Sequence, residues 1–167
     1  MLEKLRTTRR LTLGLLSLVA TATAGSVAAE EFSLSAESHG LSLKIEQAYD
    51  SAGVSKPTVA INGAVLRQYA FVQRLSIVLD HTFDNGDRAV VLHHWQGGNA
   101  CGGALTLFSL TEEGFLETDP VAQCAENFSA SVSAEEPGAV EIATYSDEAK
   151  TSQLESWLFI SDQMVKR

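Results

Sequence analysis

The sequence has little positive charge. It contains 12 Lys and Arg against 21 Asp and Glu, so its 167 residues carry a formal net charge of −9. Four of those 12 bases lie within the first ten residues. Proteins that bind nucleic acid use Lys and Arg to neutralise phosphates. The composition therefore excludes nucleic acid as an expected partner.

Cysteine is also scarce, and the usual catalytic signatures are missing. Cys101 and Cys124 are the only cysteines, and they form neither a CxxC pair nor a four-ligand set with histidine. Redox catalysis through CxxC and a structural zinc site therefore lack their minimum chemistry. No GxSxG, SxxK or HExxH motif occurs in the chain. We expect no metal site and no cofactor.

Long apolar runs are limited to one short stretch near the amino terminus. Four basic residues precede the apolar residues 11–20, and small residues then continue to Ala29. This order is typical of a secretory signal peptide. The apolar stretch is about half of the roughly 20 residues that span a bilayer. We therefore expect cleavage of the signal and no stable membrane anchor afterwards.

The cleavage site divides the chain into a signal peptide, residues 1–29, and an exported domain, residues 30–167. Cleavage before Glu30 fits the small residues Val27 to Ala29, and a second site after Ala24 stays open. Arg9 and Arg10 leave twin-arginine export open beside the general route. Removing residues 1–29 takes away four bases and one acid, which leaves a net charge of −12. The expected location is periplasmic or secreted.

Export places both cysteines where disulfides persist, and two cysteines allow one intramolecular bond. A structural Cys101–Cys124 disulfide is the first interpretation. The alternative is a Cys101 thiolate nucleophile served by His93 or His94, which requires a free thiol of low pKa.

Short segments rich in β-branched and apolar residues alternate with turn residues about every eight to fifteen positions. This spacing predicts an all-β domain, either a small antiparallel sandwich or a barrel-like meander. Leu41, Leu43 and Ile45 alternate with polar residues, as in a strand with one buried face. Asn62 and Gly63 between apolar residues predict a hairpin whose two central residues have positive φ.

Further strands are expected after the middle of the chain, as a strand and short return at 104–110 and 115–117, a hairpin over 128–144, and a last buried strand at 157–160. Residues 146–156, which precede this last strand, could equally form a short helix. Residues 30–39 are the one candidate linker. No internal repeat of fixed length is visible, so we expect a single domain.

The best-defined hairpin runs from Leu75 to Trp95. A two-residue turn at Asn85 and Gly86 would pair His81 with Val90 and Leu79 with Leu92. That register makes Asp80 and His93 diagonal neighbours within hydrogen-bond reach. A carboxylate that orients an imidazole is part of a nucleophilic triad, although no nucleophile is marked. A structural hydrogen bond is the first interpretation of this contact, and an acid/base role is the alternative.

The glycine-rich loop before the second half of the chain is the most unusual segment. Its backbone amides could contact an anionic ligand, or its glycines could permit positive φ in a tight corner beside the disulfide. The candidate ligand-contacting residues are Gly97, Gly98, Asn99, Gly102 and Gly103.

The acidic residues are unevenly distributed. Ten acids and no base lie between Glu112 and Glu148. A solvated face explains them, and a docking patch for a basic partner is the alternative. The favoured function is a non-enzymatic binding or interaction protein whose partner is an unknown protein or cell-envelope component. The alternatives are a small hydrolase that uses Asp80 and His93, and a carrier of a small ligand or metal.

Overall fold

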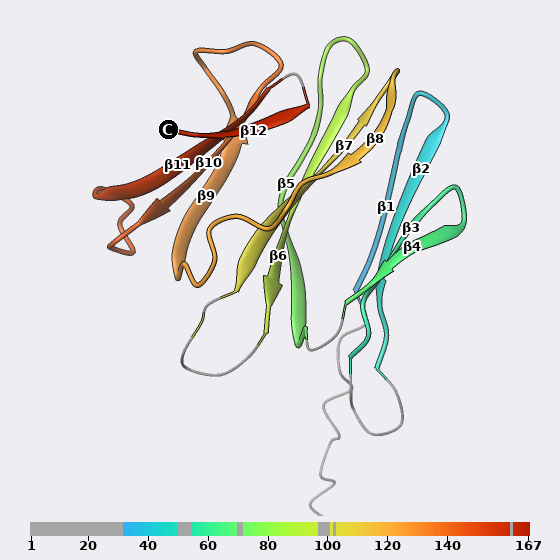
Figure 1. Ribbon diagram of the computed structural model, residues 1–167, viewed down its shortest axis with the longest axis horizontal. Helices are drawn as coiled ribbons and strands as arrows, with labels where there is room; N and C mark the ends of the chain where they lie inside the picture. The colour runs from blue at the N-terminus through green and yellow to red at the C-terminus, as the bar shows by residue number, and fades with distance from the viewer. Residues whose placement is uncertain (1–31, 50–54, 70–71, 97–100, 102, 161) are drawn as a thin grey trace, which may run out of the picture.

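A computed structural model describes residues 32–49, 55–69, 72–96, 101, 103–160 and 162–167, and these form twelve strands. Three antiparallel sheets of four strands each follow one another along the chain (Figure 1). The first sheet contains β1 (Phe32–Ser38), β2 (Leu41–Gln47), β3 (Thr58–Ile61) and β4 (Ala64–Gln68). The middle sheet contains β5 (Arg74–Thr82), β6 (Arg88–Trp95), β7 (Ala104–Thr111) and β8 (Gly114–Glu117). The last sheet contains β9 (Asn127–Val132), β10 (Val140–Tyr145), β11 (Gln153–Ile160) and β12 (Gln163–Lys166).

The predicted antiparallel all-β class is confirmed, and the sheets form three layers with the middle sheet between the other two (Figure 1). One apolar layer joins the first and middle sheets, with Leu43 and Leu92 fully buried in it. A second joins the middle and last sheets and includes Val91 and Ile142. β6 and β7 supply side chains to both layers, which explains why their sequences are almost continuously apolar rather than alternating.

Each sheet is an up-and-down meander, so its first and third connections lie at one end and its second connection lies at the other. The six turns that join β1–β2, β3–β4, β5–β6, β7–β8, β9–β10 and β11–β12 all lie at this end, which we call the turn end. The connections β2–β3, β6–β7 and β10–β11 lie at the opposite end, the connection end. Figure 1 shows the turns of the first and middle sheets pointing the same way.

The Asn62–Gly63 hairpin is confirmed. Its two central residues have φ values of 48° and 81°, and they join β3 to β4. The Asn62 carboxamide also accepts a hydrogen bond from the Ser42 backbone at 2.8 Å, which ties this turn to the neighbouring strand. Asparagine and glycine tolerate positive φ better than other residues, so the local sequence determines the turn.

The predicted register of the β5–β6 hairpin is wrong. The turn has three residues, because Phe83 and Asp87 are hydrogen-bonded partners and only Gly86 has positive φ. His81 therefore lies opposite Ala89 rather than Val90. A β-bulge between Ile77 and Leu79 shifts the remaining pairs once more. A one-residue shift exchanges the two faces of a strand, so the expected face assignments change with it.

Three other boundaries differ from expectation. The candidate linker over residues 30–39 contains β1, whose Leu34 and Ala36 are buried against the middle sheet. Residues 146–152 form a loop that leads into β11, without a helix. β12 was not foreseen, because its short polar sequence lacks an apolar pattern. The expected signal peptide, residues 1–29, lies outside the described residues.

Within the described part of the chain, no helix has the length and apolar character required to cross a membrane.

Candidate functional site

The structure does not bring Asp80 and His93 together as expected. Asp80 lies opposite Val90, and its carboxylate accepts two hydrogen bonds of 2.8 Å from Arg88. His93 lies opposite Ser76. The expected diagonal contact rested on the incorrect hairpin register, so the triad-like arrangement loses its geometric basis.

The adjacent histidines of β6 face opposite apolar layers, as the strand period predicts. The His93 ring packs on Phe128 of the last sheet with centroids 4.6 Å apart. His94 packs edge-on against Tyr69, next to the first sheet, at 4.5 Å. Burial lowers the pKa of His94 to about 4, with smaller contributions from His93 and Arg67. Over the described residues, no three His, Cys, Asp or Glu side chains are grouped to hold one metal ion.

The Cys101–Cys124 disulfide is confirmed, and it joins the β6–β7 connection to the β8–β9 connection. Gly103 beside it has a φ of +117°, and a Cβ there would lie 2.2 Å from the His94 carbonyl oxygen. Only glycine fits this position, which supports the conformational interpretation of this glycine. Gly97, Gly98, Asn99 and Gly102 lie outside the described residues, so their ligand-contacting role stays a prediction.

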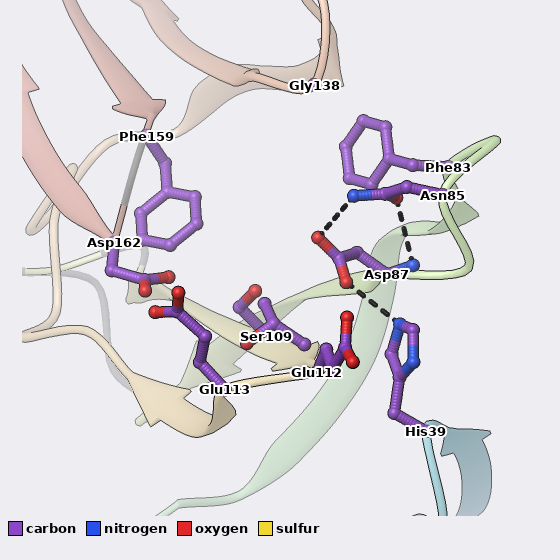
Figure 2. Close-up of a pocket in the computed structure, with 11 residues that line it drawn as sticks. His39, Phe83, Asn85, Asp87, Ser109, Glu112, Glu113, Gly138, Phe159 and Asp162 are labelled. Atoms are coloured by element: carbon purple, nitrogen blue, oxygen red, sulfur yellow. Dashed lines mark hydrogen bonds and ion pairs between the residues drawn. The ribbon is translucent and has the colours of Figure 1, made fainter.

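A cleft of about 460 Å³ opens at the turn end, and sequence reasoning did not identify it (Figure 2). Such a volume is within the range of small-ligand sites. Five of the six hairpin turns contribute to its lining. Their residues at the cleft include His39, Asp87, Glu112, Glu113, Gly138 and Asp162.

The floor of this turn-end cleft is the outer end of the second apolar layer. Ser109 of β7 follows Leu105 and Leu107 on the strand face toward the last sheet. Phe83 and Phe159, which also belong to this layer, form parts of the wall (Figure 2). Ser109 thus occupies the position at which an apolar side chain would extend the core.

Ser109 is a largely buried residue whose side chain reaches the cleft. The residue is 5% exposed and lines the cleft. Its hydroxyl makes no hydrogen bond with any described residue. The buried unpaired side-chain atoms of the described residues are His94 Nε2 and Thr106 Oγ1, so Ser109 presents its hydroxyl to the cleft and is not an unsatisfied buried group.

The rim of the cleft is acidic. Glu112, Glu113 and Asp162 are exposed, and their carboxylates make no hydrogen bond or ion pair with a described residue. None of the described lining residues is Lys or Arg. Among the described lining residues, these three carboxylates have no Lys or Arg as a counter-charge, so the cleft favours positively charged groups.

The fourth acid, Asp87, is held in place by neighbouring turns. Its carboxylate lies 3.0 Å from His39 Nε2 and accepts a 2.7 Å hydrogen bond from Asn85. The Ser38 hydroxyl donates to the Gly86 carbonyl at 2.6 Å, which joins the same two turns. The contacts between the β1–β2 and β5–β6 turns therefore give one side of the cleft a defined shape.

The sequence contained a partial signal for this site. Glu112 and Glu113 begin the acidic stretch for which a basic partner was the alternative interpretation. Asp87 and Asp162 come from other turns, and only the packing of the sheets places them at the same cleft. No family model, curated protein or solved structure matches the chain.

Proposed function

We propose that this chain is a non-enzymatic binding protein of the cell envelope, and that its turn-end cleft receives a positively charged group of another molecule. The observation that carries the proposal is a cleft that combines the Ser109 hydroxyl with a rim of exposed acids, Glu112, Glu113 and Asp162, which make no ion pair with a described residue. A cationic ligand would supply hydrogen-bond donors to both.

The proposed location follows from the amino-terminal signal pattern and is supported by the disulfide. Residues 1–29 have the order of a secretory signal. The Cys101–Cys124 bond is typical of proteins in an oxidising compartment. We therefore place the protein in the periplasm or outside the cell, where it meets a ligand or an envelope component.

The overall charge supports a cationic partner. The formal net charge of −9 attracts positive groups over a distance, and the acidic cleft concentrates that attraction at one site. Surface attraction of this kind weakens with ionic strength. Binding at the cleft should therefore be strongest at low salt and weaken as the salt concentration rises.

The test is an NMR titration of ¹⁵N-labelled protein with n-butylammonium chloride, with sodium chloride at equal ionic strength as the reference. We expect amide shifts concentrated at Asp87, Ser109 and Glu113. The double variant Glu112→Gln/Glu113→Gln should lose them. A Glu148→Gln/Glu135→Gln control removes two exposed acids outside the cleft and should keep them. Shifts equal to those of sodium chloride would contradict the proposal.

A further inference from the structure

A second cleft, of about 480 Å³, lies at the connection end, and we call it the connection-end cleft. The first sheet contributes Phe32 of β1 and the residues Gln47 and Tyr49 at the end of β2. The middle sheet contributes residues 73–76 at the start of β5 and Trp95 at the end of β6. The cleft shares no lining residue with the turn-end cleft. Its volume is within the range of small-ligand sites.

Much of the connection-end cleft is aromatic. Phe32, Tyr49 and Trp95 line it, and each is partly buried. The Tyr49 hydroxyl donates to the Gln73 carbonyl at 3.2 Å, and the buried Gln47 carboxamide donates to the same carbonyl at 2.9 Å. These hydrogen bonds occupy polar groups of the wall within the protein itself. The wall therefore presents mainly aromatic and aliphatic surface, which suits an apolar group.

Arg74 is the only charged residue among the described residues that line this cleft. Its guanidinium makes no ion pair or hydrogen bond with a described residue. Five of the eight Lys and Arg residues in the described part of the chain do pair with a carboxylate, namely Lys44, Arg67, Arg88, Lys166 and Arg167. The chain has an excess of acids, yet none of the described ones lines this cleft. Arg74 is thus available to an anion from outside.

Ser76 and Trp95 lie beside Arg74. Arg74 and Ser76 are two residues apart on β5, so their side chains leave the same face of the strand. Trp95 lies directly opposite Arg74 on β6, and side chains at opposite positions of paired strands are neighbours. The Ser76 hydroxyl also makes no hydrogen bond with a described residue. This part of the cleft therefore combines two available donors with an indole ring.

We propose that the connection-end cleft binds a small apolar carboxylate, at a site independent of the turn-end cleft. The carboxylate accepts hydrogen bonds from the Arg74 guanidinium and the Ser76 hydroxyl, and the apolar body of the ligand packs against Trp95. Guanidinium is planar and pairs with both oxygens of one carboxylate. Arg88 binds Asp80 in this way elsewhere in the protein, with two 2.8 Å hydrogen bonds. One arginine without a second base matches a single negative charge, which favours a carboxylate over a phosphate dianion.

The experiment is an NMR titration of purified, disulfide-intact ¹⁵N-labelled protein that follows the indole N–H signals of its two tryptophans. The probes are 3-phenylpropionate, 3-phenylpropan-1-ol, which lacks the charge, and propionate, which lacks the ring, at neutral pH and constant ionic strength. The Trp95 signal, assigned with Trp95→Phe, should shift, whereas that of Trp157 in the second apolar layer should not. We expect 3-phenylpropionate to bind about tenfold more tightly than either matched probe.

The variant Arg74→Gln should reduce the affinity for 3-phenylpropionate to that for the alcohol. The control Lys150→Gln removes an exposed base outside the cleft, so it changes the net charge equally and should keep the tenfold preference. Arg74 is exposed and makes no contact of this kind within the described fold, so its replacement should leave the unfolding transition unchanged. Equal affinity of the natural chain for the acid and the alcohol would overturn the proposal, as would a preference for the acid that survives Arg74→Gln.

Discussion

At the connection end, the buried carboxamide of Gln47 uses both of its polar atoms. It donates to Ser55 Oγ at 2.5 Å and to the Gln73 carbonyl at 2.9 Å, and it accepts from the Leu75 backbone at 3.0 Å. At the turn end, Ser109 is almost equally buried, at 5% exposed against 2% for Gln47. Its hydroxyl has no partner among the described residues.

The difference separates a polar group that the fold needs from one that it does not. Gln47 joins the end of β2 to the start of β5, so folding accounts for its presence. Ser109 contributes no hydrogen bond to folding at a position where an apolar residue would pack. The buried unpaired side-chain atoms of the described residues are His94 Nε2 and Thr106 Oγ1, and neither residue lines the turn-end cleft. Ser109 differs because it lines an acidic cleft.

The largest expected loss of stability comes from Gln47→Leu, which tests the role of the connection end. Leucine has a similar volume but leaves the Leu75 amide and the Ser55 hydroxyl without their Gln47 partner, while the Gln73 carbonyl keeps the hydrogen bond from the Tyr49 hydroxyl. Each unpaired buried group costs about 1–3 kcal/mol, so we expect the free energy of unfolding to fall by about 4 kcal/mol. Urea denaturation followed by tryptophan fluorescence measures this. A loss below about 1 kcal/mol would mean that the connection end does not depend on Gln47.

The disulfide gives the next largest effect. Cys101 and Cys124 are 23 residues apart, and the bond joins two connections at the connection end. The double variant Cys101→Ala/Cys124→Ala should lose about 3 kcal/mol of unfolding free energy, mainly through the freer unfolded chain. Amine binding at the turn end should persist below the unfolding transition. Loss of that binding in the folded variant would show that the two ends are not independent.

Local patterns were sufficient to predict much of the fold. Leu43 and Ile45 alternate with polar residues and are fully buried, and Asn62 and Gly63 have the expected positive φ values. The three-residue turn and the bulge of β5 could not be predicted. The Asn85–Gly86 pair does not determine the length of the turn, and the apolar run does not determine where the bulge lies. The three-layer arrangement could not be predicted either, because strands buried on both faces show no alternation of apolar and polar residues.

The site was less predictable than the fold. The disulfide followed from a count of two cysteines, and the acidic turn at Glu112 was visible in the sequence. The cleft itself combines turns far apart in the chain, such as those of His39 and Asp162. The position of Ser109 at the cleft depends on which end of the second apolar layer stays open, which is a property of packing.

His94 allows a test of whether an unpaired buried atom affects only stability. Its pKa is lowered to about 4 by burial, whereas unfolding returns it toward its ordinary value of 6.5. The unfolded state therefore binds more protons between these values, and stability is lost as pH falls through them. This linkage should cost about 2 kcal/mol between pH 7 and pH 5.

The control for this titration is His94→Leu, which removes the ionisable group. Its free energy of unfolding should fall less over the same pH interval than that of the natural chain, by the amount attributed to His94. Parallel pH profiles for the two proteins would show that His94 is not the responsible group. Amine binding at pH 7 should be equal in both, because His94 lies in the other apolar layer.

Ser109→Ala has the smallest expected effect on stability and gives the sharpest test of the comparison. The change removes a hydroxyl without a hydrogen bond, so the free energy of unfolding should change by less than about 0.5 kcal/mol. Affinity for n-butylammonium should nevertheless fall about threefold to tenfold, because a bound ammonium loses one acceptor in the cleft. Denaturation and calorimetry on the same preparation measure both quantities. Marked destabilisation with unchanged affinity would assign Ser109 to folding, like Gln47, and remove the distinction between the two ends.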